Sequence, residues 1–299
     1  MKQNWVKRII TGTLVGTLAL GLTACGSSSS ASSTSESSTA SSGDVTVINA
    51  VTGGTPKPYI TIDEDNNYSG YDIEVLKAVF EKLPQYELNI QSADFTSLFS
   101  GLQAGNYQLA VNNFSYNEDR AESYYFSYPY DEIKYVFIQR KGDEPLTSLQ
   151  DAADRGYKIE AGAGVNVTNA IEKWNEENPD SQIEIVYTEQ DQSVTFEHIQ
   201  DGTSDFRIDD LPIYQSYQEE FGFDGLEYTE LSEEETAKIS TALDAYFLFP
   251  KDEKGKALRD EINVALKELR EDGTLEKLSQ EFFGANQVPS ADKFEETIN

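Results

Sequence analysis

The sequence predicts an α/β fold made of two units, each with a parallel sheet covered by helices. From Val45 onward, short β-rich runs alternate with segments of helical periodicity, which is typical of parallel sheets. The alternation restarts near Ile133, and a chain of 299 residues has room for two ordinary domains. A hydrophobic content of 38%, with 17 Tyr and 15 Phe, is sufficient to form their cores.

The first unit is predicted from periodicity and from helix-terminating residues. The segment 70–83 places four apolar side chains on one helical face, as a helix packed on a sheet requires. Asp94 is a residue type that caps helix N-termini, and Gly105 is one that ends helices. The expected elements are a strand at 45–50, a helix at 70–83, a strand at 86–90, a helix at 94–105 and a strand at 109–111.

The second unit repeats this pattern, and the chain then continues with a strand and two helices. The expected elements of the second unit are strands at 133–140, 158–160, 183–187 and 206–208, with helices at 165–178 and 194–200. The expected later elements are a strand at 245–249 and helices at 252–270 and 275–283, followed by an irregular tail from Gly284. In open parallel sheets, ligands bind beyond the carboxyl ends of the strands. Residues 112–120 follow the strand at 109–111 directly, so we expect them at a ligand site.

Charge and cysteine content exclude several classes of function. A formal net charge of −30 disfavours nucleic-acid binding, which needs basic surfaces. A single Cys excludes an intramolecular disulfide, and with a single His it disfavours a Cys/His zinc site. We therefore expect no metal and no other cofactor.

Residues 1–24 are predicted to be an export signal, with basic residues followed by a short apolar run. The run is too short and too rich in glycine to favour a permanent membrane anchor. It ends in Leu22-Thr23-Ala24-Cys25-Gly26, which resembles the lipobox of bacterial lipoproteins and implies a lipid on Cys25. The alternative is a Cys lying by chance near an ordinary cleavage site. Residues 25–43 are nearly all small and polar, which predicts a flexible tether.

From Val45 to Gly284 the chain resembles the extracellular solute-binding proteins of polar amino acid ABC transporters. Each matching segment is weak alone, but all keep the family's order over most of the chain. The segments are Thr52-Gly-Gly-Thr-Pro-Lys-Pro-Tyr59, Ser69-Gly-Tyr-Asp-Ile-Glu74, Asp94-Phe95, Asn113-x-Ser-x-x-x-x-Arg120, Phe126-Ser-Tyr-Pro-Tyr130, the run from Gly202 to Asp210, the run from Leu266 to Thr274, and Phe282-Phe-Gly284.

The resemblance implies a two-lobe, periplasmic-binding-protein-like fold of type II, with the ligand in a cleft between the lobes. Lobe one would comprise residues 44–131 plus 248–299, and lobe two residues 135–243. Two crossing strands, near 131–135 and 242–247, would join them.

The resemblance also implies which residues bind a free amino acid. Arg120 would hold the α-carboxylate through parallel hydrogen bonds, because a guanidinium matches a carboxylate in geometry. Asp210 would hold the α-ammonium, although a slip of one residue in the alignment would exchange it with Asp209. The other expected contacts are Ser115, Asn113, Asn112, Asn166, Tyr59 and Phe95. The alternative for Arg120 is a surface ion pair, and for Tyr59 and Phe95 it is core packing.

The implied function is capture of an amino acid and its delivery to an ABC permease, at the extracellular face of a bacterial membrane. The protein would act as a monomer anchored to membrane lipid through Cys25, and not as an enzyme. Residues 52–55 contain no acid, so a basic ligand is disfavoured, and a polar neutral or cystine-like ligand is favoured. The alternatives are a ligand-sensing receptor or adhesin on the same fold, and a dehydratase acting on small acids.

Overall fold

The computed structural model describes residues 45–298. The predicted signal at 1–24, Cys25 and the predicted tether lie outside these residues. Between residues 45 and 298, none of the helices is long and apolar enough to cross a membrane.

The first sheet has six strands and is mixed, not purely parallel. Its order is β4 (Tyr86–Ser92), β1 (Thr46–Thr52), β5 (Leu109–Ser115), β13 (Asp244–Pro250) and β6 (Tyr124–Phe126), with β7 (Asp131–Glu132) also pairing with β13. Strands β4, β1 and β5 are parallel, as the strand–helix–strand pattern predicts. Strand β13 runs antiparallel to β5, β6 and β7, because it enters the sheet from a distant part of the chain. A separate hairpin pairs β2 (Thr61–Ile62) with β3 (Tyr68–Ser69).

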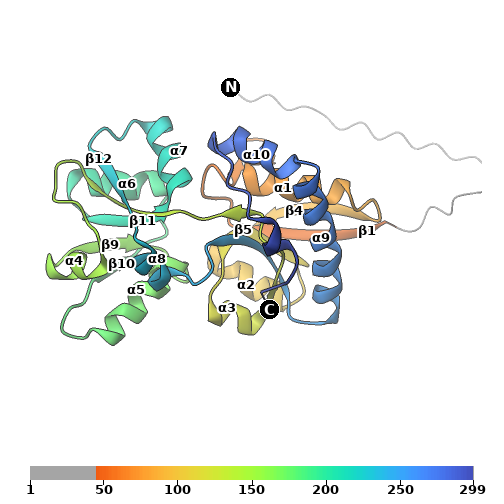
Figure 1. The fold of residues 1–299 in the computed structure, drawn as a ribbon, viewed down its shortest axis with the longest axis horizontal. Helices are drawn as coiled ribbons and strands as arrows, with labels where there is room; N and C mark the ends of the chain where they lie inside the picture. The colour runs from red at the N-terminus through yellow and green to blue at the C-terminus, as the bar shows by residue number, and fades with distance from the viewer. Residues whose placement is uncertain (1–44, 299) are drawn as a thin grey trace, which may run out of the picture. The chain divides into compact units, whose positions relative to one another are not determined.

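Helices cover both faces of this sheet (Figure 1). The helices that precede or follow its strands in the sequence are α1 (Tyr71–Glu81), α2 (Phe95–Gln103), α3 (Glu118–Ser123), α9 (Glu253–Glu271) and α10 (Thr274–Phe283). A 3-10 turn η1 (Ala291–Phe294) follows α10. Successive residues of a strand point to opposite faces. Ala50 accordingly belongs to the core under α1, α9 and α10, and Val51 to the core under α2.

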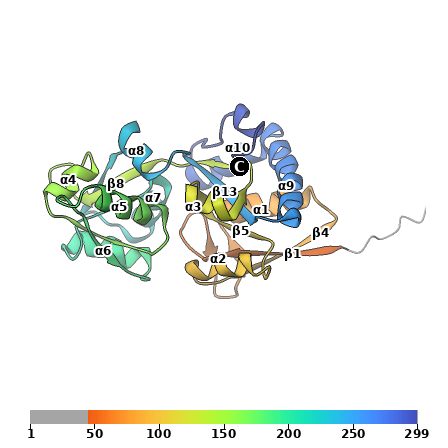
Figure 2. The same ribbon diagram turned by 90° about the horizontal axis from the view of Figure 1, so that it is seen from below.

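The second sheet has five strands in the order β10 (Glu184–Tyr187), β9 (Lys158–Ala161), β11 (Phe206–Asp210), β8 (Tyr135–Arg140) and β12 (Leu226–Glu230). Strand β8 is antiparallel to β11 and β12, so this sheet is also mixed. Its helices are α4 (Leu149–Asp154), α5 (Asn166–Glu177), α6 (Gln192–Asp201), α7 (Leu211–Phe221) and α8 (Glu233–Ile239), which gather around the sheet (Figure 2).

Two segments connect the sheets, and they run beside each other. One leads from β7 to β8, and the other leads from α8 to β13. The Ile133 amide donates to the Leu243 carbonyl at 2.8 Å, which ties the two segments together. We call the parts built on the two sheets lobe one (45–132 and 244–298) and lobe two (135–239).

Candidate functional site

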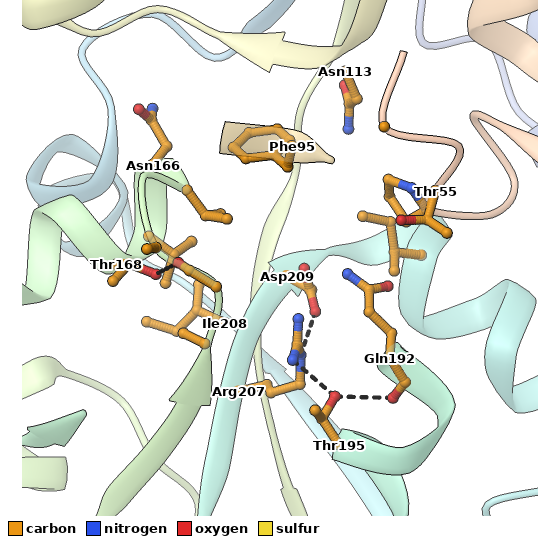
Figure 3. A pocket seen from close by; sticks show the side chains of 18 of the residues that line it. Thr55, Phe95, Asn113, Asn166, Thr168, Gln192, Thr195, Arg207, Ile208 and Asp209 are labelled. Atoms are coloured by element: carbon orange, nitrogen blue, oxygen red, sulfur yellow. Dashed lines mark hydrogen bonds and ion pairs between the residues drawn. The ribbon is translucent and has the colours of Figure 1, made fainter. Parts of the chain in front are cut away.

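A cavity of about 830 Å³ is lined by strand ends and helix starts of both lobes. Lobe one contributes the loop after β1, the start of α2, the end of β5 and Arg120. Lobe two contributes the residues after β9, the segment leading into α6, and the end of β11. Figure 3 shows Asn113 and Phe95 on one side of the cavity, and Arg207, Asp209, Thr195 and Gln192 on the other.

Arg120 lies in the first turns of α3 and lines the cavity although it is buried. The N-cap Asn117 accepts a hydrogen bond from the Arg120 amide at 2.7 Å, which fixes the start of this short helix. The guanidinium stands over the rings of Phe99 and Phe114, at 5.7 and 5.4 Å from their centroids. It donates to the carbonyls of Ser115 (2.9 Å) and Gly164 (3.0 Å).

Arg120 has no carboxylate within ion-pair distance among residues 45–298. Burial lowers the pKa of this guanidinium to about 10, because the charged form loses its water. Buried charges in proteins are normally paired. An unpaired, buried guanidinium that lines a cavity is therefore suited to bind an anionic group, and the surface ion pair considered as its alternative is not present.

Asp210 ends β11 on the lobe-two side of the cavity and is also buried. Its Oδ1 accepts from the Lys134 amide at 2.8 Å, and its Oδ2 accepts from the Tyr59 hydroxyl at 2.5 Å. Burial raises the pKa of Asp210 to about 7, and these hydrogen bonds oppose the increase only in part. A carboxylate held in this way is suited to bind a cationic group.

Tyr59 is placed differently from the expectation that it flanks the ligand. It is fully buried behind Asp210 and is not among the residues that line the cavity. Its hydroxyl oxygen lies 2.5 Å from Asp210 Oδ2 and 3.1 Å from Asp131 Oδ2. A hydroxyl has one proton, so both contacts are hydrogen bonds only when one of the two carboxyls is protonated and donates; when Asp210 is ionised, that group is Asp131. Burial raises the pKa of Asp131 well above its ordinary value, which favours that form.

Ser115 and Asn166 both line the cavity, and they also contact each other across the two lobes. The Asn166 amide donates to Ser115 Oγ at 2.8 Å and to the Tyr116 carbonyl at 3.1 Å. Its oxygen accepts from the Asn117 amide at 2.5 Å. The side chain of Asn166 thus joins lobe two to the end of β5, in addition to facing the cavity.

Asn112, Asn113 and Phe95 line the cavity from lobe one. Asn112 Oδ1 accepts from Thr52 Oγ1 at 3.0 Å and from the Gly53 amide at 2.7 Å, so it holds the loop after β1. Asn113 has a φ of 44°, in the left-handed region that Asn tolerates better than most residues. The pairing of β5 with β13 is irregular here, as is common for strands next to functional sites. Asn113 Oδ1 is buried without a hydrogen-bond partner among the described residues.

Comparisons with known proteins identify the family and the fold. Residues 48–285 match the family model described as bacterial extracellular solute-binding proteins, family 3. The chain belongs to this family. The family resemblance predicted from the sequence is thereby confirmed, and the observed sheets are those of a type II periplasmic-binding-protein fold.

Individual relatives cover most of this family 3 protein. The L-cystine-binding protein TcyJ of Bacillus subtilis is 28% identical over 241 residues, which are 80% of this chain and 84% of TcyJ. The arginine-binding extracellular protein ArtP of the same organism is 26% identical over 78% of this chain and 84% of its own. A structure from a study of glutathione import via GshT and the cystine importer TcyBC of Streptococcus mutans has a TM-score of 0.75 and 30% identity. It covers 83% of this chain and 99% of its own.

The structure adds cavity residues that the sequence reasoning missed. Arg207 and Thr195 are the missed residues, and they form a connected polar group with Asp209, which the sequence analysis considered only as the alternative to Asp210. Glu160 lies nearby, with its carboxylate 2.8 Å from His198 Nδ1. A signal was present in the sequence, since Arg207 is a cation inside a β-rich run of a strongly acidic chain. Among residues 45–298, no group of three or more His, Cys, Asp or Glu side chains is arranged to hold a metal ion.

Proposed function

We propose that this family 3 protein binds a free amino acid outside the cell membrane and delivers it to an ABC permease. The observation that carries the proposal is Arg120, a buried guanidinium in the cavity with no carboxylate partner among the described residues. An amino acid has a carboxylate and an ammonium on one carbon. Arg120 in lobe one and Asp210 in lobe two supply the opposite charge for each.

The division of these two charges between the lobes gives a mechanism for closure. A ligand held by Arg120 and Asp210 together stabilises only the arrangement in which both reach it. Because the ligand binds this closed arrangement more tightly than an open one, it shifts the protein toward closure of the two lobes. The closed form is then the one that docks on the permease. The Ser115–Asn166 hydrogen bond supports the same arrangement.

We propose a polar neutral or cystine-like ligand. Two relatives with substantial coverage are named for L-cystine, and the segment 52–55 has no acid to bind a cationic side chain. We also propose that the lipid predicted on Cys25 holds the protein at the extracellular membrane surface, where one acylated residue with two or more chains anchors stably.

Removal of the Arg120 guanidinium tests the proposal. A thermal-shift screen of free amino acids and L-cystine on the purified full-length protein first identifies a ligand, because binding raises the melting temperature. Calorimetry then compares wild type with Arg120→Ala. We expect a loss of about 3–5 kcal/mol, or about 100-fold to a few thousand-fold in affinity, because the ligand carboxylate loses its partner.

Arg140→Ala is the matched control, since Arg140 is a partly buried arginine that does not line the cavity. It should leave the affinity unchanged. The proposal fails if no amino acid raises the melting temperature, or if Arg120→Ala binds the ligand as well as wild type does.

A further inference from the structure

The cavity contains a second pair of opposite charges, formed by Arg207 and Asp209 on β11. Arg207 Nε donates to Asp209 Oδ2 at 2.6 Å, and both residues line the cavity with side chains 12% exposed. Figure 3 shows the pair together with Gln192 and Thr195. No hydrogen bond between described residues joins this pair to Arg120 or Asp210.

Arg207 is held in place and still has donor capacity. Its Nη1 donates to Thr195 Oγ1 at 2.8 Å and, more weakly, to the Glu160 carbonyl at 3.4 Å. Its guanidinium carbon lies 5.5 Å from the ring centroid of Phe196, so the aromatic face supports it. Within residues 45–298, Nη2 of Arg207 makes no hydrogen bond.

Asp209 likewise has acceptor capacity. Its Oδ2 takes the Arg207 bond, and no hydrogen bond from a described residue reaches its Oδ1. When a buried ion pair is replaced by well-packed apolar residues of similar volume, the stability of the protein often does not decrease. A stabilising effect therefore does not explain the pair. Its position in the wall of a cavity therefore points to recognition of a ligand that carries both charges.

We propose that Arg207 and Asp209 form a distal subsite for the second amino-acid group of a ligand that has one at each end. Arg207 Nη2 would donate to the distal carboxylate, and Asp209 Oδ1 would accept from the distal ammonium. The ligand class is a bis-α-amino acid with a short flexible linker, of which cystine is the disulfide-linked example. A cavity of about 830 Å³ is large for one small amino acid, since 300–1,000 Å³ is usual for drug-sized ligands.

This inference rests on the proposed function, because the proximal end of the ligand is assigned to Arg120 and Asp210. It adds a specificity: two-ended ligands bind more tightly than one-ended ones, and the difference depends on Arg207. When a ligand analogue lacks the group that a site's buried polar side chains bind, those side chains are left without partners. Such a site therefore discriminates strongly against the analogue.

The experiment compares three ligands by calorimetry on the purified full-length protein. L-Cystine and L-cystathionine have two amino-acid ends, and the thioether of the second cannot be reduced. S-Methyl-L-cysteine has only the proximal end. Wild type should bind the two-ended ligands about 100-fold more tightly than S-methyl-L-cysteine, which corresponds to one or two charge-assisted hydrogen bonds.

Arg207→Gln should remove most of this preference by weakening the two-ended ligands far more than S-methyl-L-cysteine, and its melting temperature without ligand shows that the variant is folded. Arg140→Gln is the matched control and should keep the full preference. Asp209→Asn should weaken binding of L-cystathionine more than binding of S-(2-carboxyethyl)-L-cysteine, which has a distal carboxylate and no distal ammonium.

The outcomes separate the two proposals. The distal subsite is excluded if wild type binds one-ended and two-ended ligands equally, or if Arg207→Gln weakens both to the same extent, and amino-acid binding then still stands. If wild type binds none of these ligands or any other amino acid, the proposed function itself fails.

Discussion

The carboxylate of Asp210 is a single group whose ionisation should control ligand binding. Its pKa in the described structure is raised to about 7, mainly by burial. An α-ammonium binds the ionised form of the carboxylate in preference to the neutral form. A ligand that pairs with Asp210 must therefore displace any proton bound there, and affinity is linked to pH.

We expect affinity to fall as pH decreases through 7, by up to about tenfold per pH unit, because the protonated fraction of Asp210 grows in the free protein. Calorimetry from pH 5.5 to 8, in two buffers that differ in ionisation enthalpy, measures this. About one proton should be released per ligand near pH 5.5, and almost none at pH 8.

Asp210→Asn should bind weakly at every pH and show no proton release. Glu219, an exposed residue of α7, gives a control variant, Glu219→Gln, that should keep the wild-type pH profile. An affinity that is constant over this range would exclude Asp210 as the partner of the ammonium.

At the level of elements, α3 positions Arg120, and its N-cap connects the two lobes. Asn117 Oδ1 accepts from the Arg120 amide, and Asn117 Nδ2 donates to Asn166 in lobe two. One side chain therefore starts the helix and also contacts lobe two, where it would support the closed arrangement proposed above. The two roles use different atoms and are separable by mutation.

Asn117→Ala should reduce both stability and ligand affinity, because the cap and the contact between lobes are both lost. A lost N-cap costs about 1 kcal/mol, and we expect an affinity loss of about threefold to tenfold. Asn117→Asp keeps the acceptor, so it should retain the stability and still lose affinity. Chemical denaturation and calorimetry measure the two effects.

Asp252→Ala provides the control, because Asp252 caps α9 by accepting from the Gly255 amide at 2.7 Å. It should cost a similar amount of stability without changing affinity. Equal affinities for Asn117→Asp and wild type would show that the Asn117–Asn166 contact does not contribute to closure.

The sequence predicted those helices and strands whose formation follows from the pattern of apolar and polar residues within the segment itself. The helix expected at 70–83 is α1 (Tyr71–Glu81), and the strand expected at 86–90 is β4 (Tyr86–Ser92). The strand expected at 109–111 continues to Ser115, because Phe114 and Ser115 pair with β13 more than 100 residues later. Strands β6, β7 and β12 were not predicted, since distant partners stabilise such short segments.

Prediction of the site was limited in the same way, by contacts between segments that are distant in the sequence. Arg120 and Asp210 were predicted from motifs within short stretches of sequence, and both line the cavity. The burial of Tyr59 behind Asp210 depends on the packing of α10, where Phe283 lies 5.3 Å from its ring centroid. The role proposed for Arg207 depends on Thr195 and Asp209 meeting it in space. Neither arrangement follows from local spacing.

For the whole molecule, the excess of acidic residues and the buried carboxylates should both lower the stability of the fold as pH rises. The chain has 53 acidic and 23 basic residues, so its self-repulsion decreases as carboxylates become protonated. Asp72, Asp131 and Asp210 are buried, and the pKa of each is raised chiefly by burial. The charge of Asp210 also raises the pKa values of Asp72 and Asp131, and the charge of Asp72 raises that of Asp131, as expected when charges of one sign share a low-dielectric region.

The sign of the pH dependence follows from these shifts. The pKa of Asp72 is about 7 in the folded protein and near 3.8 in the unfolded chain. Between these values the folded state binds more protons than the unfolded state. The stability from this group is present below about pH 4 and is lost as pH rises through 7. The melting temperature should therefore be about 5–10 °C higher at pH 5.5 than at pH 8.

Measurement in about 0.5 M salt separates the buried groups from the surface charge, because salt screens exposed charges much more than buried ones. In high salt, Asp72→Asn should show a smaller dependence on pH than wild type. Its amide oxygen can still accept from the Asn113 amide, which bonds Asp72 Oδ2 at 2.6 Å, so the fold is preserved. Asp63→Asn should keep the wild-type slope, because Asp63 is exposed and its pKa is lowered. If Asp72→Asn and wild type have the same slope in high salt, Asp72 is already ionised in the folded protein, and the pH dependence comes from the surface.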